Sequence, residues 1–357
     1  MKPIIDKYNQ YFERKEGPLG AQLPSENVLG FPTQDITPCR DGIGFFQHYK
    51  SGEKKLSSIY WHPDTGAHTV WGAIRTKWER SGGERGRLGY PVTDEIRTPD
   101  QKGVFQHFQQ GSIYHNPELK TGEHILYGKV RGKWAAAGWE GGRFGYPLED
   151  VQAYRAIRET QLGTKKMVTI DDYEYCTFQH GIIYSNPRAE NAILLKYKTF
   201  GGEQGFLGKP TEDFNVCPDG SGFFQHYQGG SIYWHPNTGA NLVIGSIRHR
   251  WAELGWEGGV LGYPTNDETS TPDNRGRFNQ FQRGCIYWTK EHGACELPQD
   301  VADKWAEMGW EQSYLGFPVR DEKESKDLAS KQYFSFEGGQ LFRKNGGVLP
   351  VVKMRTL

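Results

Sequence analysis

A four-residue frame, Leu-Gly-aromatic-Pro or a close variant of it, recurs six times along this 357-residue chain. Its prolines stand at positions 32, 91, 147, 210, 264 and 318, so the period lies between 54 and 63 residues. The copies are Leu29–Pro32, Leu88–Pro91, Phe144–Pro147, Leu207–Pro210, Leu261–Pro264 and Leu315–Pro318. Such a period predicts a repeat architecture, in which neighbouring repeats share a continuous core.

An Asp follows each of these prolines by three residues, at Asp35, Asp94, Asp150, Asp213, Asp267 and Asp321. Six acids at one repeat position could be catalytic groups, but a residue present in every copy is better explained as part of the scaffold. Asp bonds nearby backbone N–H groups in Asx-type turns, so we expect these side chains to order the turn after the proline. Function is then expected where the copies differ.

Short amphipathic helices are predicted between the frames. Apolar residues recur at i and i+4, which turns one Trp-bearing face toward a core. The pairs are Ile74 and Trp78, Val130 and Trp134, Ile247 and Trp251, and Val301 and Trp305. Residues 4–13, with Ile4, Ile5, Tyr8 and Phe12 at helical spacing, supply a first helix.

A β-hairpin is predicted after each frame, where aromatic and β-branched residues flank a Gly-bearing turn, as in Phe223–Tyr227 followed by Ser231–Trp234. The fold class is therefore mainly β with short helices, built from helix–turn–hairpin repeats. A single repeat domain over 1–357 would hold repeats at approximately 1–66, 67–122, 123–189, 190–240, 241–293 and 294–357. The tail Val348–Met354 is predicted to form a strand that could close a propeller-like ring, and an open solenoid is the alternative.

Composition excludes several functional classes. Lys plus Arg and Asp plus Glu both number 43, so no basic excess favours nucleic acid. No apolar stretch reaches the length of a membrane span, and no signal peptide is visible, so we expect a cytoplasmic protein, or a secreted one if the N-terminus was trimmed. The five cysteines lack zinc spacing, so we expect reduced thiols, no metal and no cofactor, with a local Cys285–Cys295 pair as the alternative.

The frames and their flanks, from about residue 15 to residue 343, resemble the LGFP-repeat family. That family is best known as modules appended to actinobacterial cell-wall proteins such as corynebacterial mycolyltransferases. The resemblance implies a propeller-like fold and binding of wall or glycan material. It carries over no catalytic residue, and no Gly-x-Ser-x-Gly esterase motif accompanies the repeats.

Positions that vary among the repeats are the candidate ligand contacts. The residue after the second-strand Tyr is Trp61, His115, Ser185, Trp234, Trp288 or Arg343, and Trp faces can stack on sugar rings, so Trp61, Trp234 and Trp288 come first. His48, His107 and His226 align on the first strand, and Gln47, Gln106 and Gln225 before them point to the opposite face. The three His could converge on a metal in a ring, but bonding within their own or neighbouring repeats is the preferred interpretation.

Repeat 3 is irregular, because 28 residues separate Pro147 from Tyr175 where repeats 1, 2, 4 and 5 use 14. The surplus lies within residues 151–173 and is expected to be a loop. Long loops often carry function, so Tyr154 and Arg158 join the candidates, and a purely decorative insertion is the alternative.

Two main functional hypotheses follow. The first is a binding protein that recognises glycan or cell-envelope-type ligands in grooves between repeats. The second is a small-molecule enzyme of specialised metabolism, a cyclase or cycloaddition catalyst, with one pocket in the central cavity or under the insertion of repeat 3. A protein–protein scaffold is a third possibility. The expected partner is a small molecule or a glycan, without nucleic acid or membrane insertion.

Overall fold

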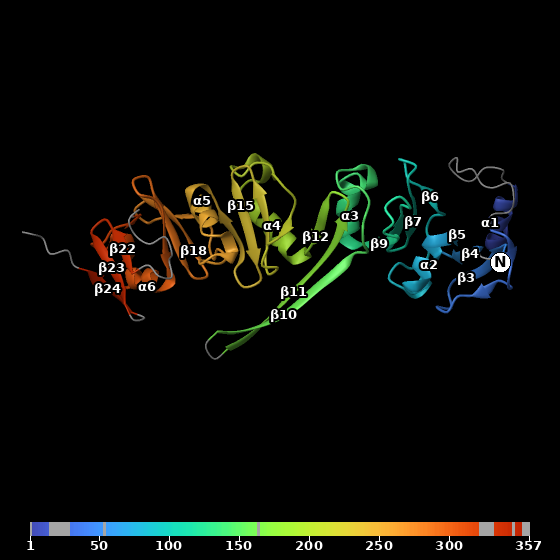
Figure 1. Ribbon diagram of the computed structural model, residues 1–357, viewed down its shortest axis with the longest axis horizontal. Coiled ribbons are helices and arrows are strands. Elements are labelled where there is room, and N and C mark those ends of the chain that lie inside the picture. The colour runs from blue at the N-terminus through green and yellow to red at the C-terminus, as the bar shows by residue number, and fades with distance from the viewer. Residues whose placement is uncertain are drawn as a thin grey trace, which may run out of the picture. The chain divides into compact units, whose positions relative to one another are not determined.

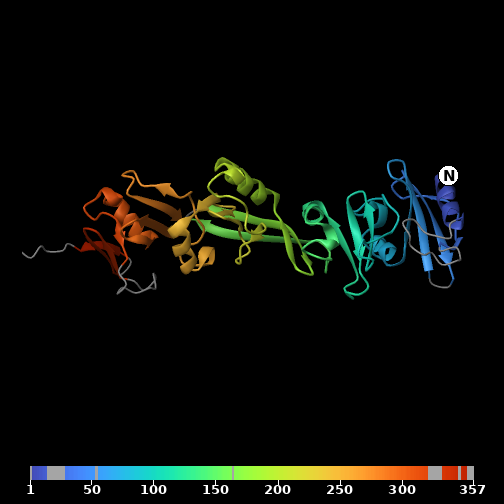
Figure 2. The ribbon, with the colours of Figure 1, turned by 90° about the horizontal axis from the view of Figure 1, so that it is seen from above.

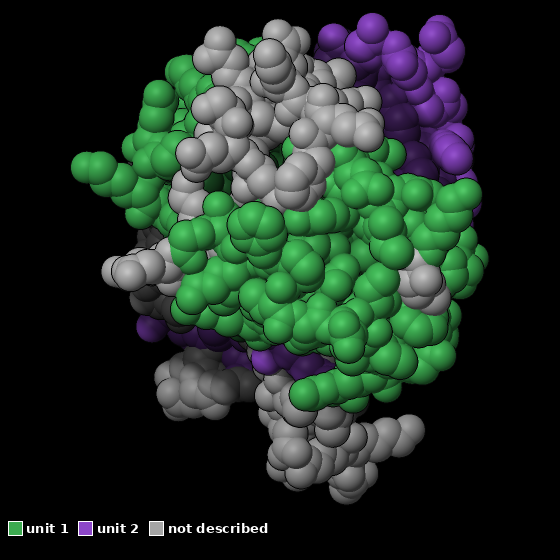
Figure 3. Space-filling model, turned by 90° about the vertical axis from the view of Figure 1, so that its right-hand side faces the viewer, with its two compact units in different colours: residues 1–154, 172–185 green, residues 155–171, 186–357 purple. Residues whose placement is uncertain are grey.

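The computed structural model describes residues 2–13, 29–52, 55–162, 165–320, 332–344 and 347–351, with the backbone alone at residues 12, 13, 55, 156–162, 165–171, 344 and 351. The chain divides into two compact units (Figure 3), unit 1 with Met1–Tyr154 and Asp172–Ser185, and unit 2 with Arg155–Asp171 and Asn186–Leu357. Each unit is described by itself. None of the helices in the described ranges combines the length and apolarity that crossing a membrane requires.

Unit 1 holds the first three repeats apart from residues 155–171, which belong to unit 2, and each repeat has a helix before its frame and an antiparallel sheet after it (Figures 1 and 2). The elements are α1 (Lys2–Glu13); sheet 1 with β1 (Phe31–Pro32), β2 (Thr37–Pro38), β3 (Phe45–Ser51), β4 (Lys55–His62) and β5 (Gly66–Trp71); α2 (Gly72–Arg80); sheet 2 with β6 (Ile96–Arg97), β7 (Val104–Phe108), β8 (Gly111–His115) and β9 (Glu123–Tyr127); α3 (Gly128–Ala136); and sheet 3 with β10 (Gln152–Leu162), β11 (Lys165–Phe178) and β12 (Gly181–Ser185).

Unit 2 repeats this order with the last three frames. The elements are α4 (Pro187–Thr199); sheet 4 with β13 (Asn215–Val216), β14 (Phe223–Tyr227), β15 (Gly230–His235) and β16 (Gly239–Val243); α5 (Gly245–Glu253); sheet 5 with β17 (Thr269–Ser270), β18 (Gly276–Phe281), β19 (Gly284–Thr289) and β20 (Gly293–Pro298); α6 (Gln299–Glu307); and sheet 6 with β21 (Pro318–Val319), β22 (Tyr333–Phe336), β23 (Gly339–Lys344) and β24 (Gly347–Val351). The mainly β repeat fold with six short α-helices is confirmed in the described residues.

The predicted hairpin is only the middle of each sheet. In sheet 4, β14 and β15 form the hairpin, but β16 pairs along β15 from Ser231 to His235, and the short strand β13 pairs with the start of β14. The turn at residues 236–238 leads from β15 into β16. Each of sheets 1, 2, 4, 5 and 6 therefore has three full strands and at least one short leading strand.

One other expectation was wrong. The surplus of repeat 3 is not a loop, because it forms β10 and β11, strands of 11 and 14 residues (Figure 1). The predicted tail strand is present as β24, which pairs with β23 of its own sheet, from Gln340–Val351 to Lys344–Gly347, and so completes repeat 6.

Within each unit, a helix aromatic joins one sheet to the next one along the chain. Trp78 of α2 is fully buried, packs edge-on against Tyr60 of sheet 1 and stacks near Phe108 of sheet 2. Its indole N–H donates to the carbonyl of Gly89, the frame glycine, at 3.0 Å. Gly89 has a φ of +70°, a conformation that glycine adopts without strain. The same bond recurs at Tyr8–Gly30, Trp134–Gly145, Tyr197–Gly208 and Trp251–Gly262.

The Asp after the frame binds the preceding sheet, so the predicted local turn is wrong for Asp94, Asp150 and Asp267. Asp267 Oδ1 accepts the N–H of Leu242 in β16 at 2.8 Å, and its Oδ2 lies 2.7 Å from Nζ of Lys196 in α4. Asp94 and Asp150 bind β5 and β9 in the same way and pair with Lys7 and Lys77. Asp321 lies outside the described residues. The scaffold role therefore holds for these three, with partners from an earlier repeat.

The frame aromatic docks on a glycine of the preceding repeat. Tyr263 is buried, donates to Asp219 Oδ1 at 2.6 Å and lies against the ring of His235. A Cβ atom on Gly222 would meet Tyr263 Cε1 at 2.4 Å, so a side chain there would clash with the docked ring. Gly44, Gly103 and Gly276 stand at the same place against Tyr90, Tyr146 and Phe317.

This docking is absent at the start of each unit. Phe31, the frame aromatic of repeat 1, is 73 % exposed, and repeat 4 has the exposed Lys209 in that position. At the end of unit 1, Tyr173 replaces the receiving glycine, and no third strand follows β12 because the Asn186 side chain caps α4 at once. At the end of unit 2, Pro350 in β24 occupies the strand position that Thr69 has in β5. The N–H of Thr69 binds the frame Asp of the next repeat, Asp94, and proline has no N–H to donate. The described chain thus contains two arrays of three repeats.

Candidate functional site

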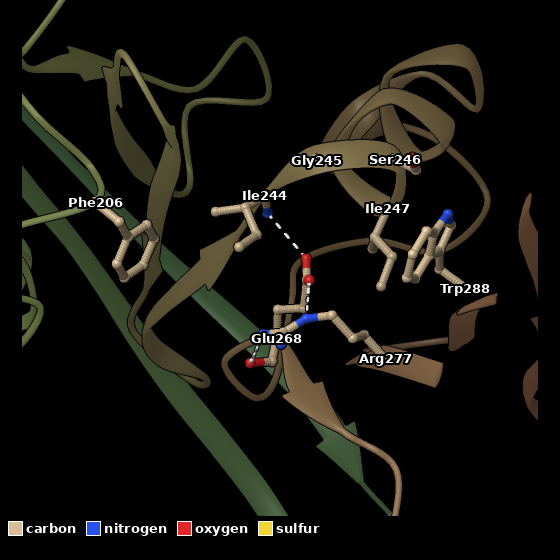
Figure 4. A pocket seen from close by; sticks show the side chains of 8 residues that line it. All are labelled: Phe206, Ile244, Gly245, Ser246, Ile247, Glu268, Arg277 and Trp288. Carbon is tan, nitrogen blue, oxygen red and sulfur yellow. Dashed lines mark hydrogen bonds and ion pairs between the residues drawn. The ribbon is translucent and has the colours of Figure 1, made fainter. Parts of the chain in front are cut away.

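A pocket of about 470 Å³ lies between sheets 4 and 5 of unit 2 (Figure 4). Its lining comes from three segments of the chain: Phe206 before the fourth frame, Ile244–Ile247 at the start of α5, and Glu268, Arg277 and Trp288 of repeat 5. Phe206 and Trp288 lie on opposite sides, and the Glu268 and Arg277 side chains meet between them. Because these segments belong to consecutive repeats, the pocket exists only when repeat 5 docks on repeat 4.

An ion pair forms the polar floor of this pocket. Arg277 Nε donates to Glu268 Oε1 at 2.6 Å, and Ile244 N–H donates to Glu268 Oε2 at 3.3 Å. The Glu268 side chain is 6 % exposed and that of Arg277 is 40 % exposed. Burial raises the pKa of Glu268, whereas the hydrogen bond and positive charge of Arg277 oppose that rise. The pair leaves the floor without net charge, which favours a neutral ligand.

The guanidinium keeps hydrogen-bonding capacity for a ligand. Besides Nε, Arg277 uses Nη1 to reach Ser270 Oγ at 3.3 Å and Nη2 to reach the Glu268 carbonyl at 3.5 Å. A guanidinium carries five N–H donors, and three are engaged by described residues, so about two remain for hydroxyl groups of a ligand. The apolar walls of Phe206, Ile244 and Trp288 complete a site with an aromatic face and a polar edge.

Of the three predicted Trp contacts, only Trp288 lines this pocket. Trp234 is 6 % exposed, and the guanidinium of Arg188 lies over its ring at 5.6 Å. Trp61 is partly buried and packs against the cluster around Ile4 and Ile59, tilted toward Phe45 at 6.0 Å.

The three aligned His bond within their own repeats and the helix that follows. Nδ1 of His226 lies 2.7 Å from Ser231 Oγ, which also accepts from Arg248 Nε at 2.6 Å. His48 and His107 have the same arrangement with Ser58 and Ser112. Burial and the neighbouring Arg lower the pKa of His107 and of His226 to about 4, and they lower that of His48 as well. Ser58, Ser112 and Ser231 are fully buried, so none of the three pairs offers a reachable nucleophile.

The Gln side chains order the scaffold where the structure describes them. Gln106 is fully buried and donates to the carbonyls of Thr69 and Thr93, both at 2.7 Å. Gln47 and Gln225 donate to the carbonyls of Gln34 and Glu212. Tyr154 stacks on Tyr173 at 4.7 Å within the β10–β11 hairpin, and the side chain of Arg158 lies outside the described residues.

Possible metal ligands gather once within the described residues, at Glu291, His292 and Glu337. Arg275 Nη2 already lies 2.6 Å from Glu337 Oε1, and Glu337 Oε2 accepts the N–H of Phe317 at 3.2 Å. This group is therefore satisfied as an ion-pair contact between repeats 5 and 6. All five cysteines are free and buried, so Cys285 and Cys295 form no disulfide.

Sequence reasoning missed most of the pocket. Phe206, Ile244, Glu268 and Arg277 were not singled out, because their proximity depends on how repeat 5 docks on repeat 4. One signal was present, since an acid follows the frame Asp at only three of the six copies, Glu95, Glu268 and Glu322.

The sheets, the frame-mediated docking and the inter-repeat pocket define a β-rich repeat protein. Sequence comparison then gives its family: the LGFP repeat matches residues 29–86, 88–142, 207–259 and 261–313. The chain therefore belongs to the LGFP-repeat family. The matches cover the first two repeats of each unit, and the terminal repeats 3 and 6 depart from the pattern, as end repeats of arrays commonly do.

No curated protein matches the chain. Among solved structures, a candidate 6-phosphogluconolactonase of Bacteroides uniformis is 11% identical, with 93% of this chain and 85% of that chain covered and a TM-score of 0.13. A second one, from Bacteroides fragilis, is 9% identical over 93% of this chain and 84% of that chain, with a TM-score of 0.11. Likeness at these TM-scores supports no statement about the fold or function of this chain.

Proposed function

We propose that this protein is a binding protein that takes a neutral glycan, or a similar polyhydroxylated ligand, in the pocket between repeats 4 and 5. The observation that carries the proposal is the Trp288 ring beside the Glu268–Arg277 pair. Aromatic rings stack on the apolar faces of sugar rings, and a guanidinium with unused N–H groups donates to hydroxyls. Phe206, at 56 % exposure, gives the opposite wall.

A binding role is favoured over catalysis because the described pocket presents a satisfied ion pair. Glu268 accepts from both Arg277 and Ile244, so its carboxylate is held in place, and Ser246, the hydroxyl-bearing residue of the described lining, makes no hydrogen bond to it. The enzyme hypothesis rests on the insertion of repeat 3, whose side chains from 156 to 171 lie outside the described residues. Closure of the six repeats into a propeller-like ring also stays a prediction, and small-angle scattering of the full chain would test it.

A glycan array probed with the full chain tests the proposal, followed by titration of any retained neutral glycan. Phe206→Ala and Trp288→Phe should each weaken binding by about tenfold, equivalent to roughly 1.4 kcal/mol of lost contact. Tyr314→Ala, which removes an exposed aromatic outside the pocket, should leave affinity unchanged. Circular dichroism would establish that each variant is folded.

Two results would contradict this function. One is an array on which no glycan is retained at high protein concentration. The other is a retained glycan whose affinity is the same in Phe206→Ala, Trp288→Phe and the unaltered chain, which would place recognition elsewhere on the molecule.

A further inference from the structure

Unit 1 contains a partly buried carboxyl group with no hydrogen-bond or ion-pair partner among the described residues. It belongs to Glu95, which follows Asp94 as Glu268 follows Asp267. The two acids occupy corresponding places, because Asp94 binds the N–H of Thr69 in β5 and Asp267 binds that of Leu242 in β16. Glu95 is therefore the counterpart, between repeats 1 and 2, of the acid in the pocket of unit 2.

The strand register shows why Glu95 lacks a partner. In sheet 5, Ser270 pairs with Arg277, and in sheet 2 the corresponding pair is Arg97 with Val104. Val104 thus stands where Arg277 neutralises Glu268. A partly buried carboxylate without a counter-ion loses free energy of hydration that no partner restores. A bound cation from a ligand would offset that loss.

Trp71 precedes α2 as Ile244 precedes α5, so it stands at the position of a residue that lines the pocket of unit 2. The buried Nε1 of Trp71 has no hydrogen-bond partner within the described residues. Glu95 interacts electrostatically with the exposed Arg97 and with Tyr11 of α1, and the adjacent Asp94 is paired with Lys7. Burial raises the pKa of Glu95 to about 7, with Arg97 acting in the opposite direction.

We propose that unit 1 carries a binding site for a small organic cation, a primary ammonium group, with Glu95 as its counter-ion. The ligand cation takes the place that Arg277 holds in unit 2, and the Trp71 ring offers an aromatic face of the kind on which cations settle. The site lies in the other unit from the glycan pocket and differs from it in ligand charge, so either proposal can fail alone.

Isothermal titration of the full chain with butylammonium chloride tests the site, with butanol as the uncharged control; neither molecule is a sugar, so the glycan pocket does not enter the result. Butylammonium should bind, and butanol should not bind at the same concentrations. An alkylammonium group, like the Lys side chain, stays protonated from pH 6 to pH 8. Because a carboxyl of pKa about 7 is mostly protonated at pH 6 and mostly ionised at pH 8, affinity should be about tenfold weaker at pH 6. Glu95→Gln should weaken butylammonium binding at least tenfold at pH 8. Equal binding by Glu95→Gln, or equal binding of butanol, would overturn the proposal.

A reciprocal pair of variants tests the counterpart argument. Val104→Arg should supply an internal guanidinium, lower the pKa of Glu95 measured by carbon NMR and abolish butylammonium binding. Arg277→Val should add a second butylammonium site in unit 2. Thermal melting identifies any variant that fails to fold, in which case Glu95→Gln alone decides. A folded Val104→Arg chain that binds butylammonium as before would contradict the proposal.

Discussion

Single residues of the frame each make one contact between repeats. The glycine offers its carbonyl to a helix Trp or Tyr, as Gly262 does for Trp251 at 3.1 Å. The aromatic fills the space above a glycine of the repeat before it, as Tyr263 does above Gly222. These contacts explain why the pattern is kept although the chain around it varies, since each residue type is required by a neighbour that is distant in sequence.

The buried His–Ser–Arg contacts predict a pH dependence. The pKa of His226 is lowered to about 4, below the unfolded value near 6.5, so the unfolded chain binds a proton that the folded chain rejects between these values. Stability from this His is complete above pH 6.5 and is lost as the pH falls toward 4, by up to about 3 kcal/mol.

His226→Gln should remove this contribution, because repeat 5 carries Gln280 at the same strand position. Urea unfolding at several pH values between 4 and 7 would measure the free energy of unfolding of both chains. The variant should lose stability less steeply on acidification than the unaltered chain. An identical pH profile would mean that the pKa of His226 is the same in the folded and unfolded chains, contrary to this prediction.

At the scale of elements, the Asp and a helix lysine pin three segments together. Asp267 holds β16 through Leu242 and α4 through Lys196. Asp267→Ala should cost about 1–3 kcal/mol, because it leaves the Leu242 N–H without its acceptor. Asp267→Asn should cost less, since an amide oxygen can still accept that bond.

Chemical denaturation of both variants with Lys196→Met, alone and combined, separates the two contacts. The ion pair is partly exposed, with side chains 25% and 31% accessible, so its coupling energy should stay within about 1 kcal/mol. Equal stability of Asp267→Ala and the unaltered chain would show that the Asp does not hold the repeats together.

Local patterns in the sequence predicted the elements better than their partners. The i, i+4 spacing of Ile74 and Trp78 correctly indicated α2, and the aromatic runs correctly indicated the β14–β15 hairpin. The third strands, such as Gly239–Val243, were missed because the hairpin pattern of aromatic and β-branched residues ends at the second strand. The partner of Asp267 lies 25 residues earlier, so turn chemistry could not reveal it. Trp288 was predicted as a ligand contact because its position varies among the repeats. Arg277 could not be predicted, because its place beside Glu268 depends on the strand register.

At the scale of the whole molecule, the division into two groups of three repeats explains which repeats depart from the common frame contacts. Frame aromatics are replaced or exposed at repeats 1 and 4, and the receiving glycine gives way to Tyr173 at the end of unit 1. Stacked repeats draw their stability from neighbours, so damage at one junction should spread through its own array. We therefore expect a destabilising change at a junction in one unit to lower the stability of that unit and not of the other.

The most direct test of whether the two units respond separately is hydrogen exchange followed by mass spectrometry, applied to Gly44→Ala and Gly222→Ala. Each added Cβ meets a docked Tyr ring, at 2.4 Å from Tyr90 Oη or Tyr263 Cε1, and overpacking of this kind costs about 1–3 kcal/mol. Gly141→Ala and Gly258→Ala, where no atom lies within 4 Å, are the matched controls. Gly44→Ala should speed exchange in residues 29–154 alone and Gly222→Ala in residues 186–320 alone. Faster exchange spread equally over both units in either variant would contradict the account.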